Sequence, residues 1–103
     1  MMLISQDGHK AIDTADILYY VIFPLKGEAD EYELMVEPNR YGSTGEDYFG
    51  KLILFRDKNL DTVKHVMRFL ASGRFFIPSD GYDGGAIEVN INNLRRHGMR
   101  GVN

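Results

Sequence analysis

The chain has 103 residues, of which 44% are apolar, 12% aromatic and 26% charged, the proportions of one globular domain. It contains no cysteine, which excludes disulfides and thiolate metal sites. No apolar run approaches the roughly 20 residues that span a bilayer, and residues 1–10 lack the pattern of a secretory signal, so we expect a cytoplasmic protein made of a single domain over residues 1–103.

The net charge of −3 is distributed unevenly along the chain. Residues 1–50 hold ten acidic and three basic residues, whereas residues 51–103 hold five acidic and nine basic residues. The last ten residues contain no acid and three arginines, namely Arg95, Arg96 and Arg100. Because Gly98 and Gly101 disfavour a regular helix, we expect residues 94–103 to form a mobile basic tail.

The order of apolar, β-branched and turn-forming residues predicts strands around one helix. In chain order the expected segments are a hairpin over 2–14 that turns at Asp7-Gly8, strands over 17–23, 32–36 and 48–56, a loop over 39–47, a helix over 60–72, an extended segment over 74–78, a turn-rich segment over 79–85 and a last strand over 87–91. Pro24 and Pro38 are expected to end the strands before them, because proline cannot donate a ladder hydrogen bond. Without βαβ alternation, the order predicts an α+β fold with a curved, mostly antiparallel sheet of five to seven strands.

The main helix, expected near residues 60–72, has signals at both ends. Asn59 is a favourable N-cap, and Gly73 stands where a left-handed residue ends many helices. Five apolar residues recur at helical spacing between them: Leu60, Val63, Val66, Met67 and Leu70. We therefore expect one amphipathic helix packed on one face of the sheet.

The strand over residues 17–23 is apolar on both faces, whereas a strand with one face in water normally alternates apolar and polar residues. One face would carry Ile17, Tyr19, Val21 and Phe23, and the other Leu18, Tyr20 and Ile22. One helix covers one face, so the other face needs sheet curvature, the segment after Gly73 or a second subunit. At ~25 cal/mol per Å² of apolar surface, leaving several apolar side chains in water would cost a free energy comparable to the net stability of a domain. We expect a strongly bent sheet or a homodimer.

Four parts of the chain follow an order seen in a known group of proteins. These are the string Leu3-Ile4-Ser5-Gln6-Asp7-Gly8, the hydrophobic strand after it, Tyr32-Glu33-Leu34, and a strand that leads into Asn59-Leu60-Asp61-Thr62-Val63-Lys64-His65-Val66. Over residues 2–72 the chain resembles small uncharacterised bacterial and phage-associated proteins with an N-terminal Ser-Gln-Asp-Gly hairpin and a single helix. It differs in a longer central loop and in some thirty additional residues after Gly73. The resemblance implies a compact β-rich core, no known activity and no functional residues to transfer.

Two loops carry partial ligand-binding patterns. Residues 45–51 have the spacing of a phosphate-binding P-loop, but Leu52 stands where Ser or Thr would bind magnesium. Residues 80–85 resemble a calcium loop, but Tyr82 and Gly84 occupy positions that need oxygen ligands. We interpret both stretches as loops and predict neither a cofactor nor a metal site.

The histidines leave an enzyme as one alternative. His9, His65 and His97 are far apart, and no two of them have the i, i+4 spacing of a helical metal site. A catalytic histidine needs a carboxylate or nucleophile that the fold brings next to it, and the sequence assigns none. The alternative is a small enzyme that pairs His65 or His97 with an acid, and we name no catalytic residue.

A second alternative is binding of nucleic acid or another polyanion. Arginines bind phosphate and aromatic rings stack on bases. The candidate anion-binding residues are Arg74, Arg95, Arg96 and Arg100, with Phe75 and Phe76 as stacking partners. The acidic first half of the chain opposes this function.

The interpretation we favour is a non-enzymatic protein-interaction module that self-associates as a homodimer or docks on a protein partner, with no membrane contact. It would use the sheet surface that the helix does not cover, where exposed aromatic residues dominate contact energies. The candidate partner-binding residues are Tyr19, Tyr20, Phe23, Tyr41 and Tyr48.

Overall fold

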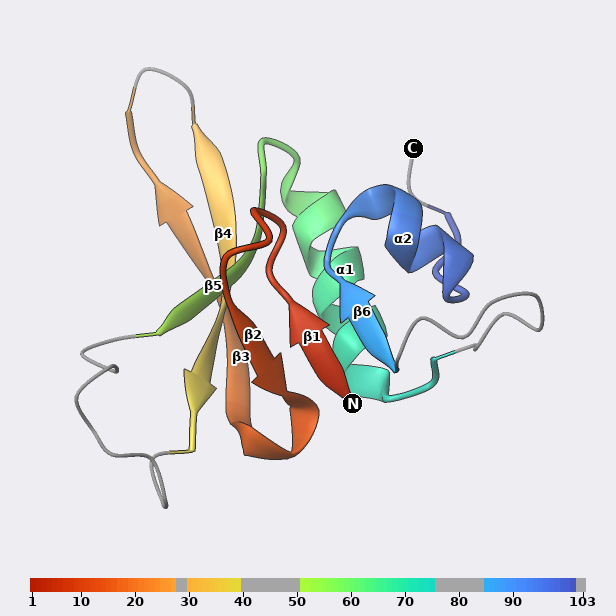
Figure 1. Cartoon of the computed structure of the whole chain (residues 1–103). Coiled ribbons are helices and arrows are strands. Elements are labelled where there is room, and N and C mark those ends of the chain that lie inside the picture. The colour runs from red at the N-terminus through yellow and green to blue at the C-terminus, as the bar shows by residue number, and fades with distance from the viewer. Residues whose placement is uncertain (28–29, 40–50, 76–84, 102–103) are drawn as a thin grey trace.

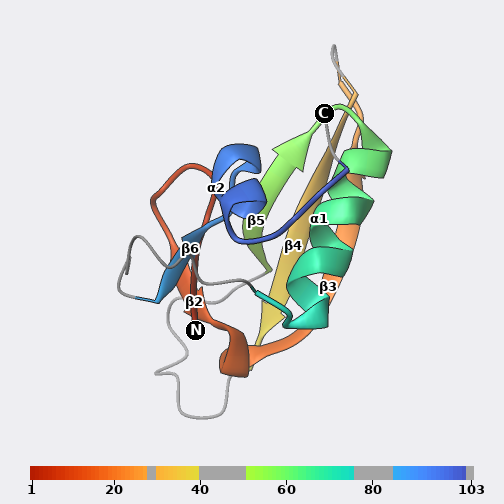
Figure 2. The ribbon, with the colours of Figure 1, turned by 90° about the vertical axis from the view of Figure 1, so that its right-hand side faces the viewer.

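The structure of the chain, a computed structural model, describes residues 1–27, 30–39, 51–75 and 85–101 (Figure 1). In chain order its elements are β1 (Met2–Ile4), β2 (Ala11–Asp13), the 3₁₀ helix η1 (Thr14–Asp16), β3 (Ile17–Leu25), β4 (Glu31–Pro38), β5 (Leu52–Asp57), α1 (Leu60–Ser72), β6 (Ala86–Glu88) and α2 (Ile91–Arg96). Figure 2 shows α1 lying along β3, β4 and β5, and Figure 1 shows α1, β6 and α2 all on the same side of these three strands.

The strands form two sheets, a first sheet in the order β2-β1-β6 and a second sheet in the order β3-β4-β5. The expected single curved sheet of five to seven strands is therefore wrong, although the α+β class is right. The chain leaves the first sheet at Asp13, whose side chain accepts the Ala15 N–H at 3.0 Å and caps η1. The third strand of the first sheet is β6, which pairs with β1 in parallel.

The predicted N-terminal hairpin is confirmed, since β1 and β2 pair antiparallel and Gly8 has a φ of 76°. The buried Ser5 hydroxyl donates to Asp7 Oδ1 at 2.6 Å and accepts the Lys10 N–H at 3.1 Å. Asp7 Oδ1 also accepts the His9 N–H at 3.0 Å. The Ser5 and His9 bonds lower the pKa of Asp7, because they stabilise its ionised form.

Gln6 joins the two sheets. Its backbone N–H donates to the Leu54 carbonyl of β5 at 2.8 Å, and its Oε1 accepts the Arg56 N–H at 2.9 Å. These bonds occupy the outer edge of β5, which stands at one end of the second sheet. Within the described residues, β3 is therefore the free edge of that sheet.

The two strand prolines behave differently. β3 continues through Pro24 to Leu25, so the prediction that Pro24 ends this strand is wrong, whereas β4 ends at Pro38 as expected. An edge strand accommodates proline because the missing N–H would face away from the neighbouring strand. A shift in pairing between Ile17 and Tyr19 makes Leu18 a bulge at the start of β3.

Helix α1 spans residues 60–72, as the sequence predicted. Asn59 Oδ1 accepts the N–H groups of Asp61 at 2.9 Å and Thr62 at 3.3 Å, and Gly73 ends the helix with a φ of 66°. The apolar stripe faces the second sheet, and its most buried members are Val63, Val66 and Leu70.

The last strand is shorter than expected. β6 ends at Glu88, because Asn90 Oδ1 accepts the Asn93 N–H at 2.8 Å and starts α2. The predicted strand over 87–91 is therefore wrong beyond Glu88. Of the other predicted segments, 39–47 and 74–85 lie largely outside the described residues, and 48–50 lie outside them entirely.

Part of the segment 94–101 packs against the core instead of leaving it as the expected tail. Leu94 lies in α2 and is fully buried, and Met99 is buried beyond the helix. Residues 102–103 lie outside the described residues. Both sheets and both helices share one hydrophobic core, formed by Leu3, Ile12, Leu34, Val36, Leu52, Leu54, Phe55, Val63, Val66, Leu70, Ile87, Val89, Leu94 and Met99.

Candidate interaction surface on strand β3

Strand β3 is a nine-residue edge strand with no charged residue, and its two faces differ in what covers them. On one face, Ile17, Tyr20 and Ile22 are partly buried and pack against the core that α1 completes. Coverage of one face by the helix is therefore confirmed.

The opposite side of β3 is exposed, contrary to the expectation that sheet curvature would cover it. The exposed fraction is 64% for Leu18, 45% for Tyr19, 42% for Phe23 and 37% for Leu25. The second sheet does not curve over these side chains, and the buried apolar residues of β4, Leu34 and Val36, lie on the opposite face. Apolar side chains thus meet solvent along one edge of the sheet.

The exposed side continues across the sheet as a surface that we call the open face, defined by Tyr19, Val21, Phe23, Met35 and Ile53. Val21, Met35 and Ile53 pair in register across β3, β4 and β5, and each is partly buried. They form an apolar row in the middle of the open face. Tyr19 and Phe23 flank this row along β3.

Charged groups border the apolar row. Phe23 pairs with Glu33 of β4, which pairs in turn with Arg56 of β5. Glu33 is 5% exposed, and its Oε2 accepts hydrogen bonds from Arg56 Nε at 3.2 Å and from the Arg56 Nη2. This carboxylate raises the pKa of Arg56, so the guanidinium stays charged. Lys51 Nζ lies 5.4 Å from the centre of the Phe23 ring, within cation–π distance.

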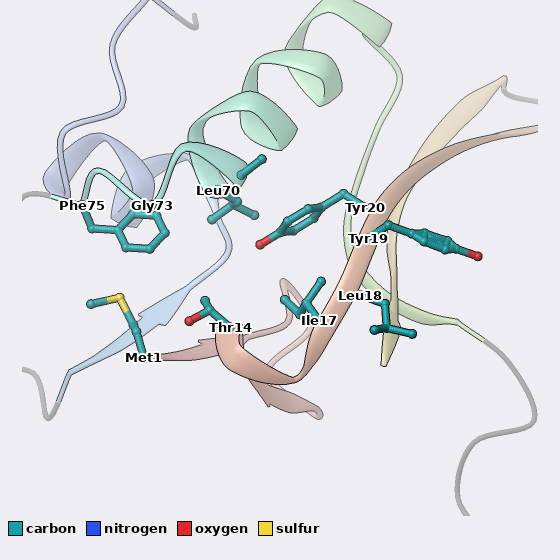
Figure 3. A pocket seen from close by; sticks show the side chains of 10 residues that line it. Met1, Thr14, Ile17, Leu18, Tyr19, Tyr20, Leu70, Gly73 and Phe75 are labelled. Atoms are coloured by element: carbon teal, nitrogen blue, oxygen red, sulfur yellow. The ribbon is translucent and has the colours of Figure 1, made fainter. Parts of the chain in front are cut away.

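A pocket of about 420 Å³ lies on the other side of β3, near the C-terminal end of α1 (Figure 3). Apolar side chains from four parts of the chain line it, among them Met1, Ile17, Leu70 and Phe75. Figure 3 shows the Tyr20 ring directed into this Tyr20 pocket, while Tyr19 points away from it.

The described residues that line the Tyr20 pocket include no histidine, lysine or carboxylate side chain. Burial raises the pKa of Tyr20, so its phenol remains a protonated donor at neutral pH. Thr14 supplies a further side-chain hydroxyl. A second hollow, of about 210 Å³, lies beside the open face and is lined by Gln6, Asp7, Lys10, Ile53, Leu54, Phe55 and Arg56. Neither hollow is lined by a histidine.

The structure separates the predicted partner-binding residues. Tyr19 and Phe23 lie on the open face and Tyr20 lies in the pocket, whereas Tyr41 and Tyr48 lie outside the described residues. The open face also contains Val21, Met35 and Ile53, which were not among the predicted partner-binding residues. The signal for one of them was present, because Met35 interrupts the alternation of β4 by placing an apolar residue among glutamates on its solvent side.

Arg74 lies apart from the predicted anion-binding arginines of α2. Arg74 follows the end of α1, whereas Arg95 and Arg96 lie in α2, and Figures 1 and 2 both show these segments apart. Phe75 contacts Phe69 edge to face at 5.4 Å between ring centres, which limits its use for stacking on bases. Phe76 lies outside the described residues. All four candidate arginines, including Arg100, are exposed.

The described residues include no cluster of three or more histidine or acidic side chains that could hold a metal ion. No helix in the described part of the chain is long and apolar enough to cross a membrane. Comparison of the chain with protein-family models, with curated proteins and with solved structures found no match. The resemblance to small bacterial and phage-associated proteins therefore stays a prediction, and the geometry of β3 carries the functional argument.

Proposed function

We propose that the protein is a non-enzymatic interaction module that binds a partner polypeptide through the free edge of β3 and the open face beside it. The observation that carries this proposal is the exposure of Leu18, Tyr19, Phe23 and Leu25 on an edge strand of nine uncharged residues. Proteins usually protect such edges with charged residues, with short strands or with a covering element, because an open edge pairs with other chains.

The open face supplies what such binding needs. A strand added at the edge gains backbone hydrogen bonds, and the neighbouring side chains decide which sequence fits. Tyr19 and Phe23 are aromatic anchors, and the row through Val21 and Met35 offers the apolar centre typical of an interface. The bordering charges of Glu33 and Arg56 would form the rim.

A chain without cysteine is compatible with a reducing compartment, and we propose that the protein acts in the cytoplasm. The enzyme alternative has less support, because in the described part of the chain neither hollow brings a histidine next to a carboxylate. The polyanion alternative has less support because Arg74 comes from a segment apart from α2 and the chain carries a net charge of −3.

The proposal is tested by two measurements on the purified protein: selection from a displayed library of random peptides, and sedimentation velocity across a range of protein concentrations. We expect the wild-type chain to enrich peptides or to self-associate, and the Tyr19→Thr/Phe23→Thr variant to lose both activities. Threonine keeps a high strand propensity, so the fold is retained. Met2→Thr, which changes an exposed apolar residue of β1, is the matched control and should behave as wild type. A wild-type chain that neither enriches peptides nor self-associates would refute the proposal.

A further inference from the structure

We infer that the polypeptide bound by β3 is a second copy of the same chain, paired antiparallel to β3 with the two Val21 residues facing each other across a two-fold axis. The inference rests on the proposed function, because it names the partner of that same edge. Such a contact uses one patch on both subunits, as most homodimers do.

The charges at the two ends of β3 specify this register. Asp16 precedes the nine uncharged residues and Lys26 follows them, and both are exposed. In an antiparallel pair centred on Val21, residue 16 of each copy lies at the level of residue 26 of the other. The bulge at Leu18 moves Asp16 by one residue, which stays within reach of a lysine side chain. Each end of the paired strands therefore brings an acid next to a base.

Parallel pairing of the same two strands has the opposite electrostatics. It would place Asp16 beside Asp16 and Lys26 beside Lys26, and like charges directly opposite each other destabilise a strand pair. The ends of β3 thus favour the antiparallel arrangement.

The side chains of the open face match in the same register. Tyr19 lies opposite Phe23 of the second copy, on both sides of the axis, and all four rings stay on one face because paired residues share a face. Both residues are more than 40% exposed in the single chain. Aromatic cross-strand pairs are among the most stabilising, so the pairing covers the side chains that the chain leaves in solvent.

The backbone of β3 is arranged for this contact. Pro24 is tolerated because its nitrogen faces away from β4, and residues two positions apart in a strand orient their backbone groups alike. Tyr20 and Ile22 therefore direct their N–H and C=O groups to the free edge. In the register centred on Val21, Tyr20 pairs with Ile22 of the second copy twice, once on each side of the axis.

Charge variants test the orientation. We expect sedimentation velocity to show a wild-type dimer, and Asp16→Lys and Lys26→Asp each to raise the dissociation constant roughly tenfold, because each variant turns two attractive contacts into repulsive ones. The Asp16→Lys/Lys26→Asp double variant restores opposite charges at both ends and should dimerise as wild type. Parallel pairing predicts no loss in the single variants, so unchanged dimerisation of Asp16→Lys would overturn the orientation.

Cysteine variants test the register, because the natural chain has no cysteine to interfere. Paired strand residues lie about 4.5–5.5 Å apart at Cα, within disulfide range, so Val21→Cys should form a cross-linked dimer on mild oxidation. Tyr19→Cys alone should not cross-link, since its copies lie about 13 Å apart along the strands, but it should cross-link with Phe23→Cys in an equimolar mixture. Cross-linking of Tyr19→Cys with itself and not of Val21→Cys would refute the register.

The two proposals fail in different ways. A wild-type chain that stays monomeric at high concentration but enriches peptides through Tyr19 and Phe23 refutes the second copy as partner and leaves the interaction module standing. A chain that does neither refutes both.

Discussion

The ion pair between Glu33 and Arg56, which borders the open face, makes a contribution to the free energy of unfolding that can be measured. The side chain of Glu33 is buried, with the residue 5% exposed, and its Oε2 accepts two hydrogen bonds from Arg56. The side chain of Arg56 is 47% exposed. Replacing Arg56 by methionine keeps the length of the side chain and leaves the carboxylate buried without its cation.

The expected magnitude lies between two limits. Breaking a fully buried pair costs roughly 3–5 kcal/mol, and exposed pairs contribute about 0.2–1 kcal/mol. Because water reaches half of the Arg56 side chain, we expect Arg56→Met to lower the free energy of unfolding by about 1–2 kcal/mol. In a domain of this size that corresponds to a fall in Tm of roughly 5–10 °C.

Urea unfolding of four proteins measures the coupling: the wild type, Glu33→Gln, Arg56→Met and the double variant. The double variant should be more stable than the sum of the single effects predicts, by about 1 kcal/mol, because it no longer buries an uncompensated charge. Arg68→Met, on the exposed side of α1, is the matched control and should change stability by less than about 0.5 kcal/mol. Additivity of the two single variants within about 0.3 kcal/mol would show that the reasoning is wrong.

Three further predictions concern the junction, the turn and the pocket. Gln6→Ala removes the bond to the Arg56 N–H and should lower stability to urea by about 0.5–1 kcal/mol; an unchanged midpoint would mean that this link between the sheets contributes nothing. The lowered pKa of Asp7 means that its ionised form stabilises the fold above its ordinary value of 3.8 and that this contribution is lost as pH falls through the lower folded value. Asp7→Asn should therefore be less stable than wild type at pH 7, with the difference closing below about pH 4 in pH-dependent unfolding, and a constant difference would contradict the assignment. Leu70→Ala, at the wall of the Tyr20 pocket, should lower the free energy of unfolding by about 2–3 kcal/mol in thermal unfolding. A smaller loss would mean that the C-terminal end of α1 repacks around the shorter side chain.

Local signals predicted the elements better than the way in which they assemble. Asn59 and Gly73 marked both ends of α1, and Asp7-Gly8 marked the hairpin, because caps and turns depend on a few neighbouring residues. The division into two sheets depends on the parallel pairing of β1 with β6, more than eighty residues away, for which no local pattern exists. The prediction that Pro24 ends its strand failed for the same reason, because an edge strand tolerates a proline and the sequence does not show which strand lies at an edge.

The candidate site was predicted in part. The two apolar faces of residues 17–23 pointed to β3, and Tyr19 and Phe23 are exposed there. The face of β3 that α1 covers depends on how β3 pairs with β4 and β5, which the sequence does not show. Tyr20 was therefore assigned to the partner-binding group, although it lies on the covered side and lines a pocket. Leu94 and Met99 were assigned to a tail, because burial by distant segments cannot be recognised in a short basic stretch.

The bonds that Gln6 makes to β5 have a consequence for the size of any assembly. A sheet with two open ends can add copies without limit and grow into a fibre, whereas the second sheet has one end already occupied by its own chain. In the proposed dimer, pairing through β3 would occupy the remaining end of the second sheet, so this sheet would not extend beyond two copies. The two bonds from Gln6 to β5 would therefore limit assembly through the second sheet to a dimer, although β3 is an exposed apolar edge strand.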